Sequence, residues 1–263
     1  MSTGTVIDIG AIADELYTAS VNRVPIERLM VRYPTLTLDD AYGVQMRNVN
    51  RALASGGSIS GKKIGLTSKA MQDMFNVNQP DYGHLFSNME ALHGRINRSS
   101  LIQPKVEAEI AFVLARDLDM QKDITAADVI AATDYVLPAF EIVDSRIRDW
   151  EIGLFDTVAD NASSGMYVLG TVRKRIGEID LKVEVMEFSM NGRKKNSGKG
   201  TDVLGDPAFC VAWLANKMRD YGTLLRKGDV ILSGALSAAI PAEKGDHFRA
   251  DYSTLGYVEV VFE

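Results

Sequence analysis

Cysteine and histidine are scarce in this sequence of 263 residues, which contains one cysteine and three histidines. A single cysteine excludes an internal disulfide framework and a zinc site built from several cysteines. Cys210 lies in the apolar segment FCVAWLANKM, whose spacing predicts a buried helix face, so we expect it in the core. His84, His93 and His247 lack the spacing of a metal site, and we expect His84 at the surface.

An excess of positive charge is also absent, since 29 lysines and arginines face 35 aspartates and glutamates, which gives a net charge of -6. Nucleic acids and anionic membranes require a basic surface, so we expect neither as a partner. No apolar run approaches the roughly 20 residues of a membrane-spanning helix. The first residues lack the basic and apolar pattern of a secretory signal, and we expect a cytoplasmic protein.

Two common catalytic motifs are incomplete or missing. The segment GGSISGKK, residues 56–63, matches the first seven positions of a phosphate-binding loop but lacks the serine or threonine that binds Mg²⁺. It also follows a predicted helix and precedes a predicted strand, the reverse of the context that such a loop needs. The nucleophile motif G-x-S-x-G is absent as well. The sequence therefore argues against nucleotide binding.

Hydrophobic periodicity divides the chain into a helical first part and a strand-rich remainder. Helices are predicted over 9–21, 38–53, 69–75, 125–132 and 208–221, and a turn-rich loop over 78–83. Strands are predicted over 63–66, 106–115, 136–143, 166–169, 182–190, 229–232, 247–252 and 257–262. Many strands with few, scattered helices indicate an α+β fold around a mixed, mostly antiparallel β-sheet core. We expect a helical N-terminal region over 1–60 and a catalytic β-rich domain over 61–263.

Two glutamates stand at the start of an apolar strand, in the segment PKVEAEIAFVLA. Residues two apart on a strand point to the same face, so Glu107 and Glu109 are expected to be neighbouring carboxylates. The apolar residues 110–114 indicate that both faces of the strand are buried. Buried like charges repel each other and lose hydration, and a cation between them resolves both problems. A solvated strand end, where paired glutamates are ordinary, is an open alternative.

A third glutamate, Glu141, lies within the apolar run AFEIV. It could pair with Arg146 or Arg148, or it could join the first two glutamates. Three carboxylates in strand contexts match a hard cation, which prefers oxygen ligands and takes water or substrate in its other positions. Mg²⁺ or Mn²⁺ fits better than zinc, because no histidine or cysteine accompanies the acids.

A polar turn and a lysine extend the candidate site. The segment DTVADNASSG places Asp160, Asn161 and Ser163 before a glycine, and it could line a site or form an ordinary helix cap or turn. Lys63 precedes the segment IGLT, in which Gly65 allows close approach of the backbone. A lysine at the mouth of an acid-rich site balances charge, or carries protons when it is desolvated. A solvated lysine at a strand start is the alternative.

Six segments follow one another along the chain: KKIGLTSKAMQ, QPDYGHLF, IQPKVEAEIAFVL, LPAFEIVDSRIRDW, DTVADNASSG and GDVILSGALSAAIPAEKGDHF. In this order they resemble the 2-hydroxypenta-2,4-dienoate hydratases (2-oxopent-4-enoate hydratases) of the hydratase/decarboxylase family. Such enzymes share the fold of the C-terminal domain of fumarylacetoacetate hydrolase. The resemblance covers essentially the whole chain, and residues 145–150 and 156–157 are similar to the hydratase branch of the family.

The resemblance implies addition of water to 2-hydroxypenta-2,4-dienoate, giving 4-hydroxy-2-oxopentanoate, in the meta-cleavage catabolism of aromatic or steroid compounds. One alternative is 4-oxalocrotonate (2-oxo-3-hexenedioate) decarboxylase, and another is 2-oxohept-3-ene-1,7-dioate hydratase. Hydrolysis of a C–C bond in an acylpyruvate, and a silent subunit that supports a partner enzyme, are more distant alternatives.

The resemblance also assigns roles to individual residues. It implies that Glu107, Glu109 and Glu141 bind Mg²⁺ or Mn²⁺, and that Lys63 and Asp81 transfer protons. It places five residues near the substrate carboxylate: Asp160, Asn161, Ser163, Gly234 and Ser237. A homo-oligomer, as a pentamer or decamer, is the habit of the family, and association with a decarboxylase or a downstream aldolase is a further expectation.

Overall fold

The computed structural model describes residues 7–75, 77–119 and 122–263. Its α-helices are α1 (Ile9–Asn22), α2 (Leu29–Arg32), α3 (Leu38–Ala54), α4 (Lys69–Phe75), α5 (Ala126–Ala132), α6 (Leu154–Ala159) and α7 (Pro207–Asp220). Its strands are β1 (Ile59–Gly65), β2 (Asp81–Phe86), β3 (Arg95–Ile96), β4 (Lys105–Leu114), β5 (Thr133–Val143), β6 (Ser164–Leu169), β7 (Val185–Met190), β8 (Arg193–Lys199), β9 (Val230–Ala235), β10 (Ile240–Pro241), β11 (His247–Tyr252) and β12 (Gly256–Phe262). All the predicted helices and strands are present, with ends shifted by a few residues.

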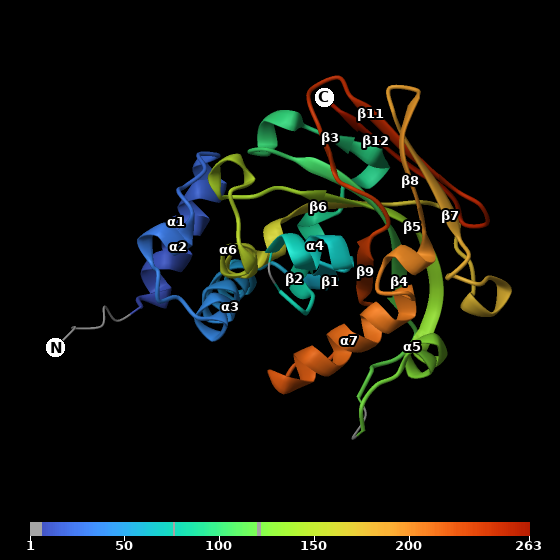
Figure 1. Cartoon of the computed structure of the whole chain (residues 1–263), viewed down its shortest axis with the longest axis horizontal. Helices are drawn as coiled ribbons and strands as arrows, with labels where there is room; N and C mark the ends of the chain where they lie inside the picture. Colours follow the sequence, from blue (N-terminus) through green and yellow to red (C-terminus); the bar gives the residue numbers. More distant parts are fainter. Residues whose placement is uncertain (1–6, 76, 120–121) are drawn as a thin grey trace.

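The strands form two sheets (Figure 1). The first has the order β2-β1-β9-β4-β5-β6, with β10 also paired to β4, and the second has the order β3-β12-β11-β7-β8. Neighbours pair antiparallel except for β1 with β9 and β3 with β12, which are parallel. The predicted α+β fold around a mixed, mostly antiparallel sheet is therefore confirmed. Phe140, Phe188, Phe248 and Phe262 pack in a row in tilted and edge-on contacts, with ring centroids of neighbours 5.4 to 6.0 Å apart.

Local sequence signals fix where the helices begin. Thr37 and Asp40 form a reciprocal capping box at the start of α3, and Thr125 and Asp128 do the same at the start of α5. Helices α1 to α3 gather on one side of the sheets, and α7 packs against α5 and β9 (Figure 1). Cys210, on α7, is fully buried as predicted. Among the described residues, no helix is both long enough and apolar enough to cross a membrane.

The predicted boundary at residue 60 falls within β1. The first six residues of the predicted N-terminal region lie outside the described part of the chain. The division into a helical region over 1–60 and a catalytic domain over 61–263 stays a prediction.

One segment was predicted incorrectly. Residues 78–83 have the composition of a turn, but Asp81 to Gly83 begin β2 and pair antiparallel with β1. Turn composition is a local signal, and it is overridden here because the segment completes the edge of the first sheet. This pairing, in which Gly65 lies opposite Asp81 and Lys63 opposite Gly83, sets Lys63 and Asp81 on adjacent strands of the site.

The first sheet curls until its two ends meet through side chains rather than through a strand ladder. The Asn161 side chain accepts a hydrogen bond from the His84 backbone N–H at 2.8 Å and donates one to the His84 carbonyl at 2.9 Å. It thereby occupies the free edge of β2 as a neighbouring strand would. The Tyr167 hydroxyl on β6 also donates to Ser60 on β1 at 3.1 Å. The curled sheet surrounds the space in which the candidate site lies.

His84 is buried, with 2% of its surface exposed, so the expected surface location is wrong. Its Nδ1 lies 3.2 Å from the Gln45 Oε1, while the Gln45 amide donates to the carbonyls of Tyr82 and Val158. Because Oε1 is then an acceptor, Nδ1 carries the proton of a neutral imidazole. Burial, together with the positive charge of Lys62, lowers the pKa of His84 to about 3.

Replacing Asn161 by alanine is expected to lower the free energy of unfolding by about 2 to 4 kcal/mol, because two polar groups of the β2 backbone lose their partners. Urea denaturation followed by circular dichroism measures the loss. Asn48→Ala is the control, since Asn48 makes a single side-chain hydrogen bond to backbone, at Ala13, away from this contact. Equal losses in both variants would show that Asn161 does not hold the sheet closed.

His84 is also expected to make stability depend on pH. The unfolded chain takes up a proton at the ordinary histidine pKa of 6.5, whereas folded His84 stays neutral until about 3, so stability falls as the pH decreases through this window. Between pH 7 and pH 5, wild type should lose about 2 kcal/mol more than His84→Asn. The half-buried residue His247, changed to asparagine, is the control and should follow wild type. Parallel pH profiles of wild type and His84→Asn would contradict the prediction.

Candidate metal centre

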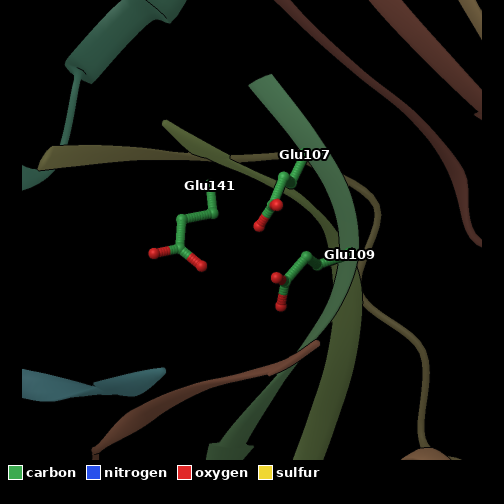
Figure 2. A group of neighbouring side chains, drawn as sticks. All are labelled: Glu107, Glu109 and Glu141. Carbon is green, nitrogen blue, oxygen red and sulfur yellow. The ribbon is translucent and has the colours of Figure 1, made fainter. Parts of the chain in front are cut away.

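Three glutamates converge from two paired strands. Glu107 and Glu141 are direct partners in the β4–β5 ladder, and Glu109 follows two residues later on the same face of β4. Each offers a carboxylate oxygen, and these oxygens all lie within 4.8 Å of one another. Figure 2 shows the three carboxylates facing a common space. The alternative pairing of Glu141 with Arg146 is excluded, because Arg146 binds Asp160.

Two of the three glutamates of this triad are buried, Glu107 is half-buried, and several of their oxygens lack hydrogen-bond partners within the described part of the chain. Glu109 and Glu141 have no exposed surface, and one Glu109 oxygen accepts a hydrogen bond from the Gly234 N–H at 2.7 Å. The other Glu109 oxygen and Glu141 Oε2 lack a polar partner among the described residues, and Glu141 Oε1 has only the ion pair with Lys63. Burial, reinforced by the neighbouring carboxylates, raises the pKa of Glu109 well above its usual range. Burial likewise raises the pKa of Glu141 to about 7, although Lys63 opposes it.

Lys63 and Asp81 face the triad from the other side of the curled sheet. The Lys63 ammonium lies 3.1 Å from Glu141 Oε1 and is buried. A Cβ at Gly65 would overlap the Asp81 carboxylate, so glycine leaves the space in which Asp81 and Lys63 lie close together. Burial raises the pKa of Asp81 and opposes the charged form of Lys63, but the surrounding carboxylates outweigh it and raise the pKa of Lys63.

The site opens into a cavity of about 520 Å³. Lys63, Asp81 and Glu107 lie on its wall, with Ser163 and Ser237. The Ser237 hydroxyl is buried and has no hydrogen-bond partner among the described residues. Most of the remaining lining is apolar: Ile64, Leu66, Met71, Val143, Trp150, Ile152, Ala162, Ala235, Leu236, Ala238 and Ala239. The cavity thus combines a charged end with an apolar wall, which suits a small amphipathic molecule.

Three residues predicted to bind substrate have other contacts. The Asp160 carboxylate pairs with Arg146 and accepts its backbone N–H at 3.0 Å, and the Asn161 amide is committed to His84. Neither residue lines the cavity of the glutamates. Gly234 donates its N–H to Glu109, and a Cβ there would overlap Thr67. Sequence patterns could not reveal these partners, because they lie on distant segments of the chain.

The turn that carries Ser163 is conformationally strained. Asn161, Ala162 and Ser163 have φ angles of 55°, 51° and 53°, and three successive non-glycine residues in the left-handed region cost roughly 1 to 2 kcal/mol each. The Asn161 amide and the Ser164 hydroxyl, which donates to the Asn161 carbonyl at 2.7 Å, hold the turn. Strain of this kind persists where the surrounding contacts over-determine the backbone, and here it presents Ser163 to the cavity.

The chain is similar in sequence to a known family and to curated proteins. A family profile described as fumarylacetoacetate (FAA) hydrolase C-terminal matches residues 72–263. The 2-hydroxyhexa-2,4-dienoate hydratase of Comamonas testosteroni is 44% identical over 250 residues, which cover 94% of either chain. The 2-keto-4-pentenoate hydratase of Paraburkholderia xenovorans is 44% identical over 252 residues, which cover 95% of this chain and 93% of the relative.

Two solved structures extend the comparison. The 4-oxalocrotonate decarboxylase from Pseudomonas putida G7, complexed with magnesium and adipate, superposes with a TM-score of 0.93 at 36% identity, over 97% of both chains. The fumarylpyruvate hydrolase from Pseudomonas aeruginosa, complexed with Mn²⁺ and pyruvate, gives a TM-score of 0.59 at 12% identity, over 77% of this chain and 89% of that one. The second likeness concerns the fold alone.

Proposed function

The chain belongs to the fumarylacetoacetate hydrolase family, and we propose that it is a metal-dependent hydratase that converts 2-hydroxypenta-2,4-dienoate (2-oxopent-4-enoate) into 4-hydroxy-2-oxopentanoate. The observation that carries the proposal is a set of four carboxylates, three buried and one half-buried, that lie around one buried lysine at the end of a largely apolar cavity. We assign the reaction to the meta-cleavage catabolism of aromatic or steroid compounds.

The donor set fits a divalent cation. Glu107, Glu109 and Glu141 supply oxygen ligands only, and their unpartnered oxygens and surplus negative charge call for a cation that a single lysine does not balance. We infer that they hold Mg²⁺ or Mn²⁺. The magnesium complex of the similar decarboxylase supports this inference. When bound, the cation supplies Lewis-acid stabilisation of negative charge on the substrate.

The side chains of the chain itself would manage the protons. The dienol first becomes a 2-oxo-3-enoic acid, losing the proton of its 2-hydroxyl and gaining one at carbon 5. Water then loses a proton as its oxygen bonds to carbon 4, and carbon 3 takes up a proton. Each transfer needs a positioned acid or base. Lys63 and Asp81 are the candidate pair: the neighbouring carboxylates keep the Lys63 ammonium protonated, and burial raises the pKa of Asp81, so that this carboxyl can hold a proton. In its ionised form Asp81 would take a proton from water, and the Lys63 ammonium would return one to carbon.

Two serines remain as candidates for direct contact with the substrate carboxylate. Ser163 and Ser237 line the cavity, and the free Ser237 hydroxyl is available as a donor. Asp160, Asn161 and Gly234 would act through the groups that they hold: the backbone around Arg146, the edge of β2 and the Glu109 carboxylate.

Decarboxylation of 4-oxalocrotonate is the second candidate function, favoured by the close superposition on the decarboxylase of Pseudomonas putida G7. An ultraviolet assay of freshly generated 2-hydroxypenta-2,4-dienoate separates the two. Loss of the dienol absorbance with a gain of one water by mass, abolished by EDTA and restored by Mg²⁺ or Mn²⁺, is expected of the hydratase. Release of CO₂ from 2-oxohex-3-enedioate without hydration of the dienoate would assign the chain to the decarboxylases.

A cytoplasmic location, a pentameric or decameric homo-oligomer and association with a decarboxylase or downstream aldolase stay predictions. Size-exclusion chromatography with light scattering determines the oligomer directly.

Replacing Glu109 by glutamine is expected to lower Mn²⁺ affinity and turnover by at least about a hundredfold, because a charged ligand is lost. The melting temperature of the metal-free protein should not fall, since the change removes a buried like charge. Calorimetric titration with Mn²⁺, activity and thermal melting are the measurements. Glu184→Gln is the control: Glu184 is equally buried but binds Thr254 through its carboxylate, so this variant should melt earlier and keep its Mn²⁺ affinity. An unchanged Mn²⁺ affinity in Glu109→Gln would remove Glu109 from the ligand set.

Replacing Lys63 by methionine is expected to lower kcat by about 10²- to 10⁴-fold, the usual contribution of a positioned acid or base. Mn²⁺ affinity should change much less, because the three glutamates stay in place. Lys62→Met is the matched control, since Lys62 is a buried neighbour that points to the opposite face of β1. Loss of metal binding with unchanged kcat in metal-saturated Lys63→Met would make Lys63 a structural residue.

A further inference from the structure

A second lysine, Lys105, lies on the cavity wall apart from the proton-transfer pair. It precedes Glu107 by two residues on β4, so both side chains project from the same face of the strand. Its ammonium lies 4.2 Å from the centroid of the Trp150 ring. Within residues 7–75, 77–119 and 122–263 it forms no ion pair with a carboxylate, whereas Lys63 is paired with Glu141. Lys105 is therefore a half-buried cation on the cavity wall that attracts the nearby Glu107 carboxylate but is not committed to an ion pair with it.

The Trp150 ring that lies beside this lysine is fixed in position. Its indole N–H donates to the Gln103 carbonyl at 3.0 Å. Asp149 and Trp150 have φ angles of 54° and 58°, a conformation that costs roughly 1 to 2 kcal/mol at each residue. A cation over an indole face is stabilised while its N–H donors stay available to an anion. The strained turn and the hydrogen bond together fix the ring beside Lys105.

The charged groups around the cavity determine where an anionic ligand is attracted and where it is repelled. Four carboxylates, a divalent cation and Lys63 leave a net charge of about -1, so a substrate carboxylate gains from one further cation. Lys105 supplies it. Leu66, Met71 and Ile152 make part of the lining apolar, and the remaining charged group on the lining is Asp202. A second carboxylate would lie against hydrocarbon or beside Asp202.

We propose that Lys105, resting on Trp150, binds the carboxylate of the substrate, and that the apolar wall takes its tail, so that the site selects dienoates with one carboxylate over dioates. This inference rests on the proposed function and deepens it by naming the residue that recognises the substrate carboxylate. Lys105 is then a specificity-determining residue that contacts substrate without transferring protons. The expected substrates are 2-hydroxy-2,4-dienoates with a short hydrocarbon tail.

Kinetics of the Mg²⁺-loaded protein with 2-hydroxypenta-2,4-dienoate test the anchor. Lys105→Met is expected to raise KM roughly tenfold to a hundredfold, the range for losing a charged hydrogen bond, with kcat within about threefold of wild type. Lys105→Arg should recover most of the loss. Lys217→Met is the control, because Lys217 lies over the Tyr221 ring, 5.4 Å from its centroid, outside the cavity. An unchanged KM in Lys105→Met, or a fall confined to kcat, overturns the proposal.

Calorimetry with two inert probes separates this proposal from the proposed function. 2-Oxopentanoate carries one carboxylate and 2-oxohexanedioate carries two, and neither has a double bond to hydrate. The Mg²⁺-loaded wild type is expected to bind 2-oxopentanoate at least about tenfold more tightly than 2-oxohexanedioate, and Lys105→Met should lose this affinity. Tighter binding of the dioate overturns the proposal. Binding of 2-oxopentanoate that depends on Lys105, in a protein that does not hydrate the dienoate, would refute the hydratase and leave the anchor standing.

Discussion

Repulsion among buried carboxylates is the constraint on which the rest of the structure depends. Glu107, Glu109 and Glu141 come from one ladder of the first sheet, and Asp81 faces them from its far end. Desolvation and like charge make this arrangement unfavourable without compensation. One lysine and one backbone N–H from Gly234 provide part of that compensation, and the proposed divalent cation would provide the rest. The glutamates can adopt these positions because the two sheets bury a large aromatic and aliphatic core that holds β4 and β5 in register.

Strained backbone surrounds the same space. Leu66, Trp150, Ala162 and Ser163 all have positive φ angles and all line the cavity. None is a glycine, so each costs free energy that tertiary contacts must offset. The offsetting contacts are specific: the Asn161 amide on the β2 edge and the Trp150 indole on the Gln103 carbonyl. Favourable tertiary contacts thus offset the backbone strain of the residues that shape one wall of the cavity.

The sequence predicted the parts of this arrangement that depend on local patterns. Periodicity and caps located the helices, and acids at two-residue spacing inside an apolar strand located Glu107 and Glu109 on one face. The resemblance to a known family supplied the chemistry of the triad. Contacts between distant segments could not be predicted in the same way. Asn161 and His84 are 77 residues apart, and a polar turn has the same composition whether it meets a ligand or an edge strand. Composition likewise did not indicate that residues 81–86 form β2 or that His84 is buried. The two-residue spacing of Lys105 and Glu107 was a usable signal for the second lysine.

The side-chain closure at Asn161 has a consequence for the motions of the protein. A sheet closed by a strand ladder opens only when many hydrogen bonds break together. Here two bonds from one amide join the β2 edge to the turn beside β6. A local fluctuation that breaks these two would separate the β2 edge from the Asn161 turn without unfolding either sheet, while the Tyr167–Ser60 hydrogen bond still joins β6 to β1. The His84 backbone amide would then exchange its hydrogen with solvent faster than the amides in the centre of β4. The contact between β2 and the Asn161 turn would be where water first reaches the interior.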